Sequence, residues 1–326
     1  MVFGTPVSQI EQPAVKQTCG DLVGRSPLSL NGRAEAQEEK MMNIKEIETK
    51  TMLVPSKLPD AQYVVNPYTG CEFGCAYCYA SFMGRFVNEP VNNWGNYVYV
   101  KTNAVSVFEK DLKRWSQARR QSSIFLSSVT DPYHGIESKY RLTRGILEIL
   151  ARETYPGLVS ILTKSPLVLR DVDILHQIPH VEVGMTITTT DDKLGRFLEV
   201  RAPLISRRLH TLKQLHEEGL HTYAFIGPLL PHFRYRPDLL EDLFARLAEV
   251  GVQSVFIEHI NLKPYIRERL LQRMQHESPE IQDVYRQASS LKHREILDRL
   301  VTNLVEKYQL RLRLNRVLYH NQNMPS

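Results

Sequence analysis

Long apolar runs are missing from this sequence of 326 residues. No run reaches the roughly 18 to 20 apolar residues that a helix needs to cross a bilayer, so no transmembrane helix and no membrane partner are predicted. The first residues also lack the basic segment followed by an apolar stretch that is typical of a secretory signal. We therefore expect a cytoplasmic protein.

Cysteine is scarce as well, because the chain has only 4. Small secreted domains that rely on disulfides carry an even number of cysteines spread over a short chain, which excludes a disulfide framework here. Cys19 stands alone, whereas Cys71, Cys75 and Cys78 are clustered. The question is what needs three thiols so close together.

Strong charge of one sign is absent too, since 41 Lys and Arg face 36 Asp and Glu for a net charge of +5. A solvated helix face explains this excess as well as an anionic partner does, so nucleic-acid binding is not favoured by charge. Residues 1–45 are rich in Gln, Glu, Ser, Gly and Pro without periodicity, and they predict a disordered tail.

From residue 46 to 264, short apolar segments alternate with amphipathic ones, which indicates a parallel sheet buried on both faces. The six predicted strands span 61–66, 123–129, 158–164, 181–189, 221–230 and 252–260. The fold class is therefore α/β, with a partial (β/α)6 TIM-like barrel. A doubly wound sheet is the alternative, because strand order cannot be read from the sequence.

The segments outside these units complete the expected organisation. Residues 96–101 alternate like a strand that lies outside the main sheet, and residues 265–326 predict a basic helical C-terminal cap, helical to about residue 313. In either sheet topology the carboxyl ends of the parallel strands carry the functional site.

The three clustered cysteines follow the first predicted strand in the segment GCEFGCAYCY, with the spacing C-x3-C-x2-C. Buried structural cysteines, a zinc site and a [4Fe–4S] cluster are the competing interpretations. Structural zinc favours four closed ligands, and no fourth cysteine is near. A cluster held by three thiolates leaves one iron free for a small molecule. Gly70 and Gly74 suit the tight turns of such a loop.

This motif resembles the radical S-adenosylmethionine (SAM) family, in which an aromatic residue, here Tyr77, precedes the third cysteine. The resemblance implies a [4Fe–4S] cluster on Cys71, Cys75 and Cys78 that binds and reductively cleaves SAM to a 5′-deoxyadenosyl radical. It also implies a reductant such as flavodoxin or ferredoxin. Tyr77 is expected to pack against the cofactor.

The segments NPYTGCEFGCAYCYA, SSVTDPYHGIE, LTKS, GMTITTTDDKLGRFLEVRAP and PLLP resemble the spore photoproduct lyase-like branch of this family. The resemblance implies contacts to SAM from Thr130, Asp131, Lys164, Thr186 and Thr188. Each of the two strand threonines could equally be an ordinary β-strand residue. Glu137, Glu199 and Arg201 lie in strand-end loops and are candidates for orienting cofactor or substrate.

Two features concern the reaction itself. The lyases of this branch carry a hydrogen-donating cysteine where this chain has Ser128, and a hydroxyl group does not readily donate a hydrogen atom. Tyr97 and Tyr99 fall where those lyases have a radical relay, although alternating tyrosines on a strand more often reflect β propensity. The loop PHFRYRP (231–237) could stack against a base or an aromatic side chain, or be an ordinary surface loop.

We therefore expect a radical SAM enzyme, lyase-like, that abstracts hydrogen from a peptide or small metabolite undergoing C–C bond cleavage or rearrangement. A small partner protein could present such a peptide. The alternatives are repair of a thymine photoproduct in DNA and a non-catalytic iron–sulfur electron-transfer module. One scaffold of this kind supports many reactions, so the resemblance does not define the substrate.

Overall fold

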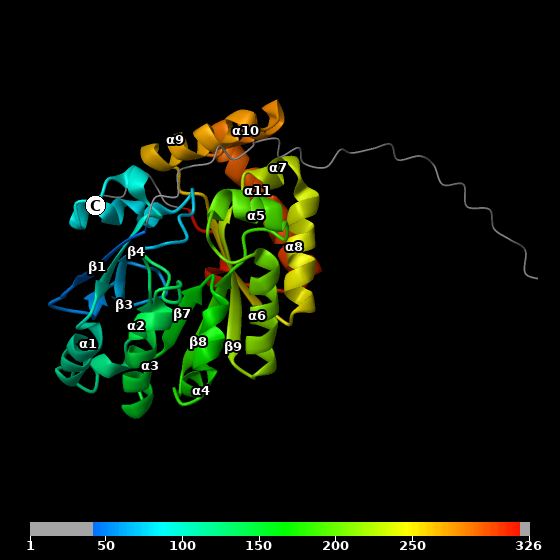
Figure 1. Cartoon of the computed structure of the whole chain (residues 1–326). Coiled ribbons are helices and arrows are strands. Elements are labelled where there is room, and N and C mark those ends of the chain that lie inside the picture. The colour runs from blue at the N-terminus through cyan, green and yellow to red at the C-terminus, as the bar shows by residue number, and fades with distance from the viewer. Residues whose placement is uncertain (1–41, 320–326) are drawn as a thin grey trace, which may run out of the picture.

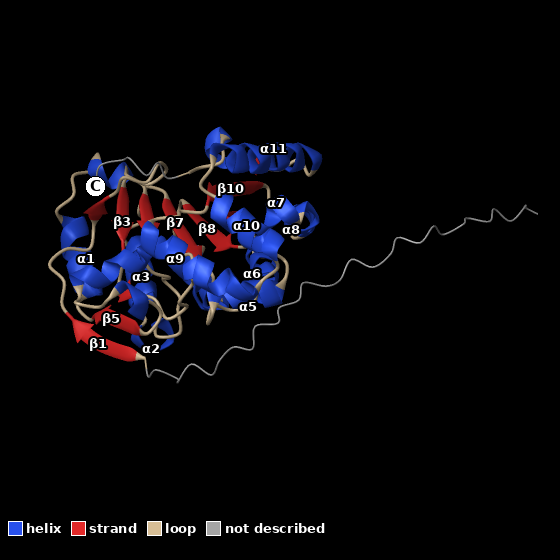
Figure 2. Cartoon of the chain, turned by 90° about the horizontal axis from the view of Figure 1, so that it is seen from above, coloured by secondary structure: helices blue, strands red, loops and turns tan. Residues whose placement is uncertain are grey.

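The computed structural model describes residues 42–319, and Cys19 and most of the predicted tail lie outside this range. Within it, one eight-stranded sheet has the order β11-β10-β9-β8-β7-β6-β3-β2. Figure 2 shows strands of this row from above, with β1 and β5 set apart from it. The strands of the row are β2 (Val54–Pro55), β3 (Tyr63–Val65), β6 (Ile124–Leu126), β7 (Val159–Thr163), β8 (Val181–Thr186), β9 (His221–Leu229), β10 (Ser254–His259) and β11 (Arg311–Leu312).

The six predicted strands are confirmed as β3 and β6 to β10, and neighbouring members of this set pair in parallel. They lie side by side in chain order, as in a barrel. A doubly wound sheet would reverse its order at a switch point, so that alternative is excluded. The described row ends at β2 and β11.

Helices follow the strands along the chain and cover the sheet (Figure 1). Between the parallel strands they are α1 (Ala104–Lys113), α2 (Glu137–Tyr140), α3 (Leu142–Arg152), α4 (Val172–Leu175), α5 (Asp192–Glu199), α6 (Ile205–Glu217), α7 (His232–Tyr235) and α8 (Pro237–Glu249). Short 3-10 helices supplement them: η1 (Tyr79–Phe86), η2 (Val91–Asn93), η3 (Arg119–Gln121) and η4 (Pro166–Asp171).

Local sequence signals explain where several helices begin and end. The Asp191 carboxylate accepts from the backbone N–H groups of Lys193 and Leu194 at 2.7 and 3.2 Å and so caps α5. Pro237 occupies the first turn of α8, and Gly251, with φ of +85°, follows its end. We did not predict α5 from the sequence, although this cap and the leucines after it are visible there.

A separate three-stranded sheet consists of β1 (Asn43–Ile47), β4 (Tyr68–Gly70) and β5 (Tyr97–Lys101), in the order β1-β5-β4. The expectation that residues 96–101 lie outside the main sheet is therefore confirmed. Strand β1 begins within the range that we expected to be tail. Its parallel pairing with β5 orders that segment.

The C-terminal extension contains the expected helices α9 (Pro264–Arg273), α10 (Pro279–Gln287) and α11 (Leu291–Lys307), with η5 (Met274–His276) and η6 (Arg313–Asn315). One part of the expectation is wrong. Residues 311–312 form strand β11 rather than helix, and they pair in parallel with β10. The chain then continues along β10, where Glu258 and Leu318 form an isolated bridge.

Arg313, directly after β11, connects the two ends of the row. Its Nη2 atom lies 3.0 Å from Glu182 on β8 and 3.7 Å from Asp60, which precedes β3. The guanidinium carbon is also 4.4 Å from the centroid of the Tyr223 ring. Arg313 thus lies near the amino ends of β8 and β9, opposite their carboxyl ends. No helix within residues 42–319 is long and apolar enough to cross a membrane.

Candidate active site

A cavity of about 270 Å³ lies at the carboxyl ends of the parallel strands, where the sequence predicts the site. All three clustered cysteines line it. Six of the other predicted residues also line it: Tyr77, Ser128, Thr130, Asp131, Lys164 and Thr186. The fold therefore brings together residues from four separate segments of the chain.

The cysteine loop follows β4 and turns sharply at two glycines. Gly70 and Gly74 have φ of +92° and +61°, a region that favours glycine. A Cβ atom on Gly70 would lie 2.7 Å from the ring of Tyr97, so this position also has no room for a side chain. The expectation of tight turns at both glycines is confirmed.

Backbone contacts fix the loop from two sides. The N–H of Ala76 donates to the carbonyl of Leu198 on α5 at 2.8 Å, and the N–H of Arg201 donates to the carbonyl of Phe73 at 3.1 Å. The Thr130 hydroxyl donates to the carbonyl of Gly70 at 2.6 Å. Thr130 thus holds the strand-end loop after β6 against the start of the cysteine loop.

The three thiols are well removed from bulk water, with Cys71 and Cys75 buried and Cys78 partly so. Burial raises the pKa of all three, that of Cys75 to about 12, while the Lys164 ammonium opposes the shift at Cys75 and Cys78. Metal coordination would supply the missing positive charge and deprotonate them.

The candidate donor set consists of three thiols. Among residues 42–319, no group of three His, Cys, Asp or Glu side chains is arranged to hold a single metal ion. The three thiols nevertheless line one cavity. A structural zinc ion requires four ligands around one centre, whereas a cluster takes one thiolate for each of several irons.

Asp131 joins the loops after β6 and β7. One carboxylate oxygen accepts from the Thr163 hydroxyl at 2.6 Å and from the N–H of Tyr133 at 2.9 Å, and the other accepts from the N–H of Lys164 at 2.8 Å. Burial raises its pKa against the effect of these hydrogen bonds. Asp131 therefore orients the backbone that carries Lys164 into the cavity. The Lys164 ammonium lies 5.9 Å from the centroid of the Tyr77 ring.

Tyr77 belongs to a buried polar group behind the cysteine loop. Its hydroxyl donates to Glu199, which also pairs with the buried Arg208 and accepts from the Thr188 hydroxyl at 3.1 Å. Burial acts to raise the pKa of Glu199, but Arg208, Lys164 and the hydrogen bond from Tyr77 together lower it. Thr188 and Glu199 thus support the loop from behind and are not among the described residues that line the cavity.

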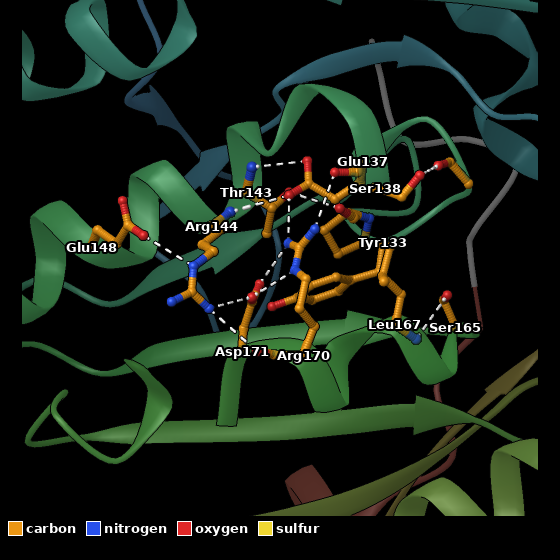
Figure 3. A network of polar contacts seen from close by, with 12 residues as sticks. Tyr133, Glu137, Ser138, Thr143, Arg144, Glu148, Ser165, Leu167, Arg170 and Asp171 are labelled. Carbon is orange, nitrogen blue, oxygen red and sulfur yellow. Dashed lines mark hydrogen bonds and ion pairs between the residues drawn. The ribbon is translucent and has the colours of Figure 1, made fainter. Parts of the chain in front are cut away.

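A second buried network supports the loop 127–137 (Figure 3). Glu137 accepts from Arg170 at 2.9 Å and from the N–H of Thr143 at 3.1 Å. Asp171 accepts from Arg170 at 2.8 Å and from Arg144 at 2.9 Å. Both carboxylates are completely buried, so Glu137 stabilises the loop and does not reach the cavity.

The predicted relay tyrosines lie apart from the cavity, in the three-stranded sheet. The Tyr99 hydroxyl donates toward the carbonyl of Val87 and the carboxylate of Glu89, both at 3.1 Å. Tyr97 is fully buried, and its ring lies 6.1 Å from those of Tyr99 and Trp94. Of these aromatic residues, only Trp94 lines the cavity.

Ser128, which we expect to stand where the lyases carry a donor cysteine, lines the cavity. Its hydroxyl accepts from the Asn66 amide at 3.3 Å, and its carbonyl accepts from the Tyr79 hydroxyl. The neighbouring Ser127 has φ of +69°, and its buried hydroxyl has no partner among the described residues. A ligand in the cavity could satisfy that hydroxyl.

Several cavity residues were missed in the sequence. Glu258, His259 and Asn261 line the cavity at the end of β10. The rule that strand ends carry the site could have found them, because they close the last predicted strand. The loop 231–237 is not part of the cavity: Phe233 is buried, and Arg236 pairs with Asp238 at 2.6 Å.

Comparisons with known proteins agree with this geometry. The family model of the radical SAM superfamily matches residues 65–243. An uncharacterized protein of Methanocaldococcus jannaschii is 39% identical over 191 residues, which cover 58% of this chain and 69% of the relative. A protein of Pseudomonas phage M6 named radical SAM Nalpha-GlyT isomerase is 26% identical over 202 residues, 60% of this chain and 39% of the relative.

Among solved structures, spore photoproduct lyase complexed with dinucleoside spore photoproduct superposes with a TM-score of 0.62. It is 15% identical, and the match covers 85% of this chain and 82% of that one, which supports a shared fold. The family match, which spans more than half of the chain and includes the cysteine loop and the strand ends around the cavity, shows that the protein belongs to the radical SAM superfamily.

Proposed function

We propose that this protein is an enzyme that holds a [4Fe–4S] cluster on Cys71, Cys75 and Cys78 and binds SAM beside it. The observation that carries the proposal is the convergence of all three thiols on one cavity at the carboxyl ends of the strands. When bound, such a cluster supplies an electron for the reductive cleavage of SAM.

The remaining cavity residues have distinct roles in this proposal. Lys164 neutralises the carboxylate of SAM, and Thr130 and Asp131 position its amino group at the end of β6. Thr186 contacts the cofactor from β8. Tyr77 packs under the site while its hydroxyl remains on Glu199. The aromatic walls exclude water, which protects a radical from side reactions.

Reductive SAM cleavage tests this proposal without knowledge of the substrate. The anaerobically reconstituted protein should release 5′-deoxyadenosine and methionine when dithionite and SAM are added. Changing Cys71, Cys75 and Cys78 together to Ala should abolish the release, whereas the control Cys19→Ala should retain it. A triple variant that still forms 5′-deoxyadenosine would contradict the assignment. A protein with an intact cluster but no turnover would instead be an electron-transfer module.

For the substrate, we propose a peptide or small metabolite that undergoes C–C cleavage or rearrangement. Ser128 at the position of the donor thiol supports this choice, because such reactions need not end with hydrogen return from a thiol. The cavity walls are mostly apolar and aromatic, with Phe125, Phe225 and Phe256 among them, and would accept an apolar group. The phage relative is named an isomerase, so a rearranging enzyme occurs among the relatives.

Repair of a DNA photoproduct is the second candidate, favoured by the superposition on spore photoproduct lyase. An oligonucleotide that carries the photoproduct separates the two candidates. Reversal of the lesion under anaerobic, reducing conditions would support repair. Failure of reversal by protein that still cleaves SAM would exclude it. The Ser128→Cys variant should be included, because it restores the thiol at this position.

A further inference from the structure

Helix α9 lies against the cysteine loop and presents one face to it. In Figure 1 this orange helix lies close to the cyan segment that follows the cysteines. Three residues at intervals of four form this face: Tyr265, Arg269 and Arg273. Such residues project from the same side of a helix.

Each of the three reaches a backbone carbonyl, either at the end of the cysteine loop or on α5. The Tyr265 hydroxyl donates to the carbonyl of Tyr79 at 3.1 Å. Arg269 donates to the carbonyl of Cys78 at 3.5 Å and to the hydroxyl of Ser81 at 3.0 Å. Arg273 donates to the carbonyl of Phe197 at 2.6 Å. The two guanidinium groups are therefore held beside the last cysteine of the motif and the end of α5.

Among the described residues, neither arginine has an acidic partner. Within residues 42–319, no carboxylate lies within ion-pair distance of Arg269 or Arg273, and the buried Nε of Arg269 has no hydrogen-bond partner. Partly buried cations without a counterion are costly, which indicates that an anion belongs nearby.

We infer that Arg269 and Arg273 are the counter-charges of the iron–sulfur cluster and raise its reduction potential. The inference rests on the proposed function, because the cluster is the anion. Three thiolates give a [4Fe–4S] cluster a net negative charge, and reduction adds one more. Net charge is one of the factors that set the potential of such clusters. Fixed cations therefore stabilise the reduced form more than the oxidised form.

The sequence of α9 offers matched controls. Tyr265→Phe removes a contact of the same helix face but no charge. Arg267→Gln removes a charge from another face, where Arg267 donates to the carbonyl of Arg286 at 3.2 Å. Arg269→Lys retains the charge of the side chain that contacts Cys78. Together these variants separate the effect of charge from that of docking.

The experiment is a redox titration of the anaerobically reconstituted full-length protein, followed by electron paramagnetic resonance of the reduced cluster. Arg269→Gln and Arg273→Gln should each lower the equilibrium constant for one-electron reduction about tenfold, or about 59 mV toward more negative potential. The double variant should shift further. Tyr265→Phe, Arg267→Gln and Arg269→Lys should remain near the wild-type value.

Iron and sulfide content, measured on the same samples, distinguishes a failure of the proposed function from a failure of the role inferred for Arg269 and Arg273. If the wild-type protein assembles no cluster, the proposed function fails. If the cluster assembles and the double variant titrates like wild type, or shifts toward positive potential, the role of Arg269 and Arg273 is overturned. An equal negative shift in Tyr265→Phe would also overturn it, because loss of docking rather than charge would then be responsible.

Discussion

Two pairs of arginines flank the loops that form the cavity, and they differ in what neutralises them. Arg144 and Arg170 contact two buried carboxylates, Glu137 and Asp171. The pair on α9, Arg269 and Arg273, contacts carbonyl and hydroxyl oxygens. The first pair completes its own charge balance and so stabilises the loop 127–137. The second pair has no carboxylate partner within residues 42–319, which fits a role toward a negative ligand.

The largest effect is expected from removing one arginine of the first pair, Arg144 and Arg170, whose charges are balanced by buried carboxylates. Arg170→Met leaves Glu137 and Asp171 buried with less compensation, and should lower the free energy of unfolding by about 3–5 kcal/mol. Urea denaturation measures this change. Arg152→Met is the control: Arg152 pairs with Glu109 at the surface, so its loss should cost less than about 1 kcal/mol. Equal losses in the two variants would contradict the assignment.

A double variant sharpens the same point. Glu137→Gln removes one buried negative charge, so Arg170→Met should destabilise the protein less in that background. We expect a coupling energy of about 1–3 kcal/mol from the double-mutant cycle. Additive losses would mean that the contact between Arg170 and Glu137 at 2.9 Å contributes little.

The stability of the loop 127–137 should also depend on pH. His134 is fully buried beside Tyr68, and burial lowers its pKa to about 3. Below a pH of about 6.5 the unfolded chain binds a proton on this histidine, whereas the folded protein does not. As the pH falls further, the free energy of unfolding therefore decreases by about 1.4 kcal/mol per pH unit because of this group.

His134→Phe tests this contribution, because phenylalanine keeps an aromatic ring and cannot titrate. Between pH 6.5 and 5.5, roughly the first unit below the ordinary histidine pKa, the wild-type protein should lose about 1 kcal/mol more than the variant. Parallel pH profiles from urea denaturation would show that His134 is not the group responsible.

The smallest effect on the free energy of unfolding is expected for Arg269 on α9. In protein without a cluster, Arg269→Met removes a partly buried cation that has no carboxylate partner in the described part of the chain. The loss of stability should therefore stay below about 1 kcal/mol. The same denaturation experiment measures it. A loss as large as that of Arg170→Met would remove the distinction between the two pairs of arginines.

Much of the fold followed from periodicity, because strands buried on both faces are continuous apolar runs. The six barrel strands were predicted in this way, and β5 was correctly separated from them. Strands β1 and β4 were not predicted, and neither were β2 and β11, which have two residues each. So short a segment carries no period, and its pairing depends on distant partners.

The site was predicted unevenly for a similar reason. The cysteines and Lys164 stand at recognisable positions of a motif or strand end, and all of them line the cavity. Thr188 also stands at a strand end, but its hydroxyl is bonded to Glu199 behind the loop. The roles of Tyr265 and Arg269 on α9 depend on contacts across some 190 residues, which no local pattern contains.

The amino-acid sequence alone determined the class of fold and the kind of chemistry, because apolar periodicity and thiol spacing are local properties of the chain. Only the tertiary structure decided which polar groups have partners. It paired Glu137 and Asp171 with arginines. It placed Arg269 and Arg273 beside the cysteine loop and the end of α5, with no carboxylate partner among the residues that the structure describes. Charge compensation depends on distances between segments far apart in the sequence, and these exist only once the chain has folded.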